Sequence, residues 1–118
     1  MATVSSHILD SVNGKSAVGI RSQLFQLVGD TERQLIFDVV ADQEGRVAET
    51  VVIDDANSGC EFELVFHGAE YFSSQGQDAK SMVKTVVLRF VMNDEQQRYH
   101  MPVMLSPHSY STWWSGRS

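Results

Sequence analysis

The stretch RYHMPVMLSPHSYSTWW, residues 98–114, alternates apolar and other side chains on both sides of a serine-proline step and ends in two adjacent tryptophans. Alternation with a period of two is typical of β-strands, and Ser106-Pro107 is a turn signal. The stretch therefore predicts two short strands joined by a tight turn. It also places an imidazole, that of His100, in what otherwise reads as a buried strand.

Similar alternating runs fill the rest of the chain, with turn signals such as Asn13-Gly14 between them. Only residues 69–77 break the alternation and lack β-branched side chains, so we expect one short helix there. About eight short strands at regular spacing predict an all-β sandwich of two sheets. The other expected strands cover residues 5–12, 20–28, 33–42, 46–53, 60–68 and 82–92.

Composition narrows the class of protein. The chain has 118 residues, which predicts a single domain over residues 1–118, and its net charge is −6 with a pI near 5.0. No basic stripe is present, so we expect no nucleic-acid partner, and no apolar run is long enough to predict a membrane span. Cys60 is the only cysteine, which fits a reducing compartment and a structural thiol. We expect a cytoplasmic protein, or a peroxisomal one if the source is a eukaryote.

Three polar residues are unusual for a sandwich: His7, Arg46 and His100. Their spacing matches no metal-binding motif, so we predict no metal site. Taken singly, each could be a satisfied or solvent-facing strand residue, and His67 and His108 have no stronger claim. The residues alone thus lead to an acidic β-sandwich without an assigned activity.

Three motifs add a resemblance. HILDSVNGKSA (residues 7–17), DQEGRV (42–47) and RYHMPVMLSPHSYST (98–112) occur in an order and at distances that resemble the transthyretin superfamily. The string Leu-Ser-Pro-x-Ser-Tyr-Ser-Thr at 105–112 is the most specific part. The resemblance covers roughly residues 5–112 and implies a transthyretin-like β-sandwich.

The superfamily has two main branches, a vertebrate hormone carrier and 5-hydroxyisourate hydrolase. The carrier has lysine, glutamate and threonine where this chain has His7, Arg46 and His100, the hydrolase set. The resemblance therefore implies hydrolysis of 5-hydroxyisourate to 2-oxo-4-hydroxy-4-carboxy-5-ureidoimidazoline in urate degradation, without a cofactor. It also implies a homotetramer built as a dimer of dimers. The alternative is a non-enzymatic protein that binds a small molecule on the same scaffold.

The chemistry of these side chains fits such a reaction. A histidine titrates near neutrality and can take a proton from water, and an arginine can hold a planar substrate rich in carbonyl groups. We therefore assign His100 as the base, Arg46 as the substrate clamp and His7 as the residue that orients water or substrate. The two histidines could exchange roles.

The C-terminal tail departs from the resemblance. Hydrolases of this branch end in Tyr-Arg-Gly-Ser, whereas this chain ends in Trp-Trp-Ser-Gly-Arg-Ser. We expect Ser111, Trp113 and Arg117 to contact substrate, unless the altered tail no longer completes the site. In an extended segment Trp113 and Trp114 would point to opposite faces, one packing inward and the other toward a partner subunit; alternatively, both would cover a sandwich edge.

Overall fold

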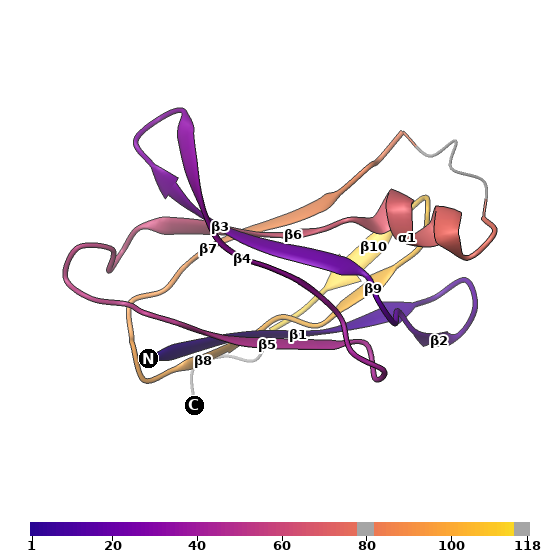
Figure 1. Ribbon diagram of the computed structural model, residues 1–118, viewed down its shortest axis with the longest axis horizontal. Helices are drawn as coiled ribbons and strands as arrows, with labels where there is room; N and C mark the ends of the chain where they lie inside the picture. Colours follow the sequence, from indigo (N-terminus) through magenta and orange to yellow (C-terminus); the bar gives the residue numbers. More distant parts are fainter. Residues whose placement is uncertain (78–81, 115–118) are drawn as a thin grey trace.

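Two β-sheets packed face to face carry the structure, a computed structural model that describes residues 1–77 and 82–114 (Figure 1). The six-stranded sheet contains β1 (Ala2–Asp10), β2 (Lys15–Ser16), β5 (Arg46–Val51), β8 (Arg98–His100), β9 (Val103–Leu105) and β10 (Tyr110–Thr112). The four-stranded sheet has the order β4 (Glu32–Val40), β3 (Arg21–Val28), β6 (Glu61–Phe66), β7 (Val86–Val91). The one described helix, α1 (Gly68–Ser74), follows β6. The predicted all-β sandwich with one short helix is confirmed.

The core lies between the sheets and follows the strand alternation. Phe62, Leu64 and Phe66 of β6 are buried, as their spacing predicts, and they face buried residues of β1 such as Val4 and Ile8. Burying large apolar side chains of this kind stabilises a fold by about 1.5–3 kcal/mol each. The inward side chains of β1 are therefore those at even positions, and the odd positions point to the opposite face of the sheet.

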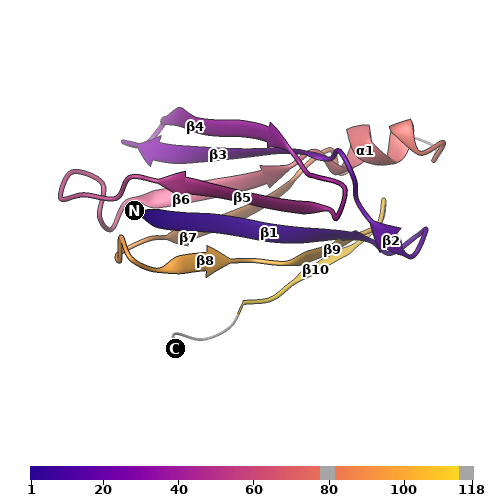
Figure 2. The ribbon, with the colours of Figure 1, turned by 60° about the horizontal axis from the view of Figure 1, so that its bottom comes forward.

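Strand β1 is central in its sheet. It pairs antiparallel with β5 on one side and parallel with β8 and then β9 on the other (Figure 2). The interruption between β8 and β9 falls at Met101-Pro102, and proline has no N–H to give to a ladder. Ser6 Oγ donates to the carbonyl of Met101 and Thr112 Oγ1 to that of Pro102, both at 2.7 Å. Side chains thus satisfy the backbone where the ladder stops.

This interruption explains two differences from the expected strands. The single strand expected around residues 99–105 is divided into β8 and β9. Independently of this, the two-residue β2 was not anticipated, so the described residues form ten strands. The final strand ends at Thr112 and does not include the tryptophans, because Val103 is the first residue of β9 and Pro102 cannot extend the ladder. Two other boundaries differ from the expectation. The helix expected at 69–77 ends at Ser74, and the strand expected at 82–92 begins at Val86.

A buried carboxylate ties the helix to the sheet. Asp10, at the end of β1, accepts a hydrogen bond of 2.8 Å from the hydroxyl of Tyr71 in α1 and others from Asn13 and the backbone of Val12. Burial opposes ionisation, but the hydrogen bonds from Asn13, Tyr71 and Val12 together hold the pKa of Asp10 below its usual value.

Within the described ranges no helix has the length and hydropathy needed to cross a membrane.

Candidate active site

The outward face of the six-stranded sheet gathers the three residues singled out in the sequence. His7 of β1 is paired directly with Arg46 of β5, and Ser5 of β1 is paired directly with His100 of β8. Directly paired residues project to the same face, and those two positions apart along a strand are near neighbours on it. His7, Arg46 and His100 therefore lie together on three adjacent strands, β5, β1 and β8, which Figure 2 shows side by side.

A tight turn presents Arg46. Asp42 Oδ1 accepts hydrogen bonds from the backbone N–H groups of Glu44 at 2.9 Å and Arg46 at 3.0 Å. Gly45 has φ 74°, and its carbonyl accepts from the N–H of Ile8 at 2.8 Å. A Cβ at Gly45 would lie 2.7 Å from the carbonyl oxygen of Ile8, so only glycine fits against β1 here. The turn is therefore clamped to the strand that carries His7.

The turn brings the carboxylates of Asp42 and Glu44 close to Arg46. The backbone hydrogen bonds from Arg46 and Glu44 lower the pKa of Asp42, with smaller contributions from the charge of Arg46 and the nearby imidazole of His7. The Arg46 side chain is half exposed, and its Nε lies 4.0 Å from the carboxylate of Glu44, at the limit of an ion pair. Such a pair between exposed groups is weak, so the guanidinium can accept a ligand.

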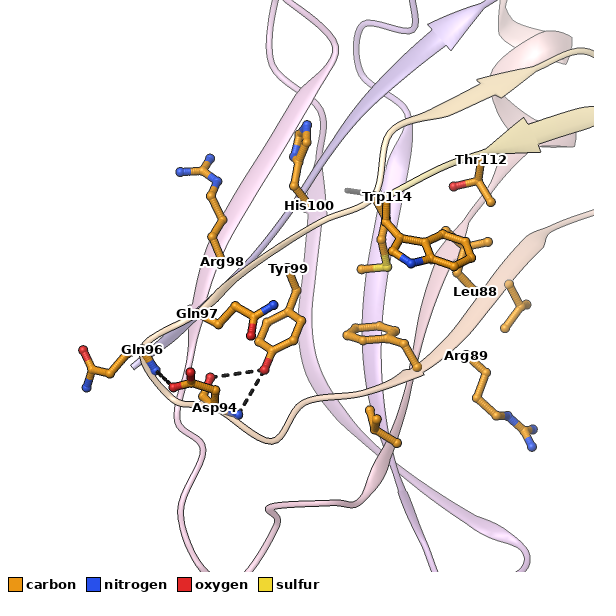
Figure 3. Close-up of a pocket in the computed structure, with 14 residues that line it drawn as sticks. Leu88, Arg89, Asp94, Gln96, Gln97, Arg98, Tyr99, His100, Thr112 and Trp114 are labelled. Atoms are coloured by element: carbon orange, nitrogen blue, oxygen red, sulfur yellow. Dashed lines mark hydrogen bonds between the residues drawn. The ribbon is translucent and has the colours of Figure 1, made fainter. Parts of the chain in front are cut away.

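His100 is half-buried on the same face, and its Nδ1 lies 2.8 Å from Ser5 Oγ. Burial lowers the pKa of His100 below its usual value, and the positive charges of Arg98 and Arg46 and the nearby imidazole of His7 lower it further. Near neutral pH this imidazole is therefore uncharged. Figure 3 shows the side chains of Arg98 and His100 on one side of β8, with Tyr99 on the other, where its hydroxyl bonds to the backbone of Asp94.

The structure describes two of the three tail residues expected to contact substrate, Ser111 and Trp113. Ser111 is paired with Met104, which is paired with Leu9, so Ser111 is on the outward face of the sheet. It lies on β10, and β9 separates it from β1. Trp113 and Trp114 are 46% and 70% exposed, so the prediction that one of them packs inward is wrong for the single chain. Arg117 lies outside the described residues.

Trp114 instead borders a cavity of about 920 Å³ at the open edge between the two sheets (Figure 3). Trp114 lies there because β10 ends at Thr112. Past that residue the described chain makes one backbone hydrogen bond, of 3.4 Å, from the N–H of Trp113 to the carbonyl of Pro102. Strand β8 lines this cavity with Arg98, Tyr99 and His100, although the side chains of Arg98 and His100 point to the other side of β8 from that of Tyr99. The remaining lining residues include Leu88, Phe90 and Met101.

The other two histidines are elsewhere. His67 Nε2 lies 2.6 Å from Gln23 Oε1, beside the four-stranded sheet, and His108 belongs to the turn after β9. Within residues 1–77 and 82–114, no three His, Cys, Asp or Glu side chains gather closely enough to hold a metal ion. The chemistry available on the outward face is therefore proton transfer by imidazole and binding of an anionic or carbonyl-rich ligand by guanidinium.

Sequence reasoning missed two residues of this face, Ser5 and Arg98. Arg98 Nε donates a hydrogen bond of 3.2 Å to Ser5 Oγ, the same oxygen that meets His100. Each precedes a histidine by two positions, and that spacing puts a side chain on the same face of a strand. The spacing was available in the sequence, but serine and arginine in a strand are too common to stand out.

Comparison with known proteins gives the family. The family model described as HIUase/Transthyretin family matches residues 4–115. A relative named 5-hydroxyisourate hydrolase 2, from Rhizobium meliloti, is 36% identical over 112 residues, covering 93% of this chain and 92% of the relative. Among solved structures, 5-hydroxyisourate hydrolase of Klebsiella pneumoniae has a TM-score of 0.77 at 23% identity, covering 98% of this chain and 100% of that one. Sea bream transthyretin in complex with thyroxine has a TM-score of 0.81 at 22% identity, covering 98% and 96%. Fold likeness at this level does not separate the two branches, but the matched sequence establishes that the chain belongs to the HIUase/transthyretin family.

Proposed function

We propose that this protein hydrolyses 5-hydroxyisourate to 2-oxo-4-hydroxy-4-carboxy-5-ureidoimidazoline. The observation that carries the proposal is the direct pairing of His7 with Arg46, with His100 beside them across β1. The Rhizobium meliloti relative, 36% identical over nearly the full length of both chains, supports the choice of substrate.

The reaction adds water across a ring C–N bond. The water oxygen bonds to the carbonyl carbon and one water proton goes to an imidazole, while the ring nitrogen leaves and takes up a proton. Arg46 binds the substrate carbonyls and stabilises the negative charge that forms on the attacked oxygen. A histidine with a pKa near or below neutrality can accept the proton without a cofactor or a covalent intermediate.

The shape of the site supports an oligomer. Its residues lie on an open sheet face, where Arg46 itself is half exposed and the nearby Met104 is exposed. A shallow site of this kind gains depth when a second subunit covers it. We propose a homotetramer, a dimer of dimers, in which the outward faces of the six-stranded sheets meet. Light scattering after gel filtration would measure the mass directly.

The experiment that tests the function adds the protein to urate undergoing oxidation by a urate oxidase and follows the absorbance of the transient intermediate. We expect faster decay of that intermediate. His7→Ala, Arg46→Ala and His100→Ala should each slow it by roughly 100-fold or more, in the range lost when a general base or an oxyanion partner is removed.

His67→Ala and His108→Ala are the matched controls, because both histidines lie away from the outward face, and they should retain full activity. If the wild-type protein left the decay unchanged while still binding the intermediate, the second candidate function would hold. That candidate, a small-molecule binder without turnover, is favoured by one observation: the exposed tryptophans make no hydrogen bond or ring contact with the three site residues in the described part of the chain.

A further inference from the structure

We infer that Ser5 and Arg98 are positioning residues that hold His100 as a neutral imidazole with its proton on Nε2. His100 then donates a hydrogen bond to the substrate, and His7 is the group left to accept the proton from water. The roles of the two histidines in the reaction rest on the proposed hydrolysis, whereas the tautomer of His100 rests on the hydrogen bonds alone. This division exchanges the roles that the sequence suggested for the two histidines.

Ser5 is buried although it occupies an outward position of β1. It is only 2% exposed, because His100 and Arg98 of the neighbouring β8 cover it. Its hydroxyl therefore has no ready access to solvent, and its hydrogen must find an acceptor in the protein.

The Ser5 hydroxyl has one suitable acceptor for that hydrogen. Among the described residues Ser5 Oγ has two hydrogen-bond partners, Arg98 Nε at 3.2 Å and His100 Nδ1 at 2.8 Å. A guanidinium nitrogen can only donate, so the one partner able to accept the serine hydrogen is the imidazole nitrogen. Nδ1 is therefore unprotonated, and the proton of a neutral His100 is on Nε2.

The hydrogen bonds run in one direction, from Arg98 through Ser5 to His100. A donor bonded to a hydroxyl oxygen polarises it, which makes its own O–H a stronger donor. Arg98 thus strengthens the bond from Ser5 to His100. Protonating Nδ1 would require the serine hydroxyl to rotate and leave its hydrogen without a partner beside a positive charge.

The surrounding charges act in the same direction. The charged or titratable groups that face His100 are Arg98 on its own strand, His7 on β1 and Arg46 on β5. None of them is negative. The lowered pKa of His100, due first to burial and then to these neighbours, agrees with an imidazole that stays neutral through the catalytic cycle.

The consequence for the reaction is a division of labour. Nε2–H of His100 and the guanidinium of Arg46 both donate to the oxygen where negative charge develops. His7, paired with Arg46 and free of a serine partner in the described residues, takes the water proton. A neutral histidine can serve as a hydrogen-bond donor of this kind when its environment keeps it from protonating.

The direct test is a long-range ¹H–¹⁵N correlation spectrum of the ring nitrogens, recorded as a pH titration on the full-length protein. We expect His100 Nδ1 to be of the unprotonated type at pH 8. Ser5→Ala should give a mixture of tautomers, and Ser5→Thr, which keeps the hydroxyl, should restore the single form. Arg98→Gln should shift the titration of His100 to higher pH. Ser22→Ala, at a buried serine of the other sheet, and Arg21→Gln, at an exposed arginine there, are matched controls that should change neither property.

The activity readout separates positioning from a merely structural role. Arg98→Gln and Ser5→Ala should lower kcat about 10- to 100-fold with little change in KM, the cost of a slightly misplaced group. The acid limb of kcat/KM should keep its wild-type position in Arg98→Gln, although the titration of His100 moves to higher pH in that variant. A protonated Nδ1 in the wild-type spectrum, or a Ser5→Ala spectrum identical to it, would overturn the inference. If the spectra are as expected but the protein does not hydrolyse 5-hydroxyisourate, the tautomer assignment stands and the proposed function is refuted.

Discussion

Replacing Gly45 by alanine should destabilise the protein by about 3 kcal/mol and impair the site at the same time. The glycine has φ 74°, a left-handed conformation that costs an L-residue roughly 1–2 kcal/mol. The new Cβ would meet the carbonyl oxygen of Ile8 at 2.7 Å and Ser16 Cβ at 2.8 Å, and the backbone oxygen cannot move away cheaply. Relief requires the turn to shift, which weakens the hydrogen bond from the Ile8 N–H to the Gly45 carbonyl, worth about 1 kcal/mol.

Gly29→Ala is the matched control, since Gly29 has φ 69° but no atom within 4 Å of the position that an alanine methyl group would occupy. It should cost about 1–2 kcal/mol, the backbone part alone. Urea unfolding of both variants at one protein concentration measures the difference, which isolates the contact with β1. Because Arg46 follows Gly45 directly, kcat/KM should fall about tenfold in Gly45→Ala and stay unchanged in Gly29→Ala. Equal stability losses in the two variants would refute the close packing of this turn.

Three other predictions concern stability and assembly. Tyr71→Phe should lower the free energy of unfolding by about 1–2 kcal/mol, because Asp10 loses a hydrogen bond of 2.8 Å in a buried place; thermal unfolding measures this, and an unchanged Tm would contradict it. Hydrogen bonds from Arg89 and then Arg33 hold the pKa of Glu63 below its usual 4.5 despite its burial. The stability that the Glu63 carboxylate contributes is therefore present above about pH 4.5 and is lost as the pH falls through its folded-state pKa. Glu63→Gln should thus flatten the acid side of a plot of unfolding free energy against pH. An equally steep plot would show that other carboxylates dominate. Truncation after Thr112 should leave the sandwich folded by circular dichroism but weaken the tetramer and lower kcat/KM sharply, and a tetramer with full activity would show the tail to be dispensable.

Most of the sheet could be read from the sequence because burial imposes a period of two on a strand. Phe62, Leu64 and Phe66 are buried as their alternation predicts, but the central position of β6 buries Glu63 and Val65 between them as well, which the alternation does not predict. Alternation says which face a residue occupies but not which strand lies beside it. The parallel pairing of β1 with β8 and β9 therefore had no signal in the pattern, and the short β2 is too small to have one.

The candidate site shows the same limit. His7, Arg46 and His100 stood out through a family resemblance, and the register puts them on one face. Ser5 escaped notice because its role depends on which side chains cover it, a property of packing and not of local sequence. The tryptophans were expected in a strand because the apolar pattern continues through them, but the strand stops where Pro102 offers no N–H to pair with.

The bond between Ser5 and His100 spans 95 positions of the chain, and this has a bearing on biosynthesis. Strand β1 is translated before β5, β8 and β9, so the backbone N–H and C=O groups along both of its edges stay unpaired until those strands have been made. Contacts of such long range form slowly, and a waiting central strand is exposed to association with other chains. Translation that stops before Arg98 yields a polypeptide in which His7 can pair with Arg46 but Ser5 lacks its counterpart on β8. The outward face of β1 is therefore completed only after residues 98–100 have been translated, so the proposed site and this side of the sheet depend on the same late pairing.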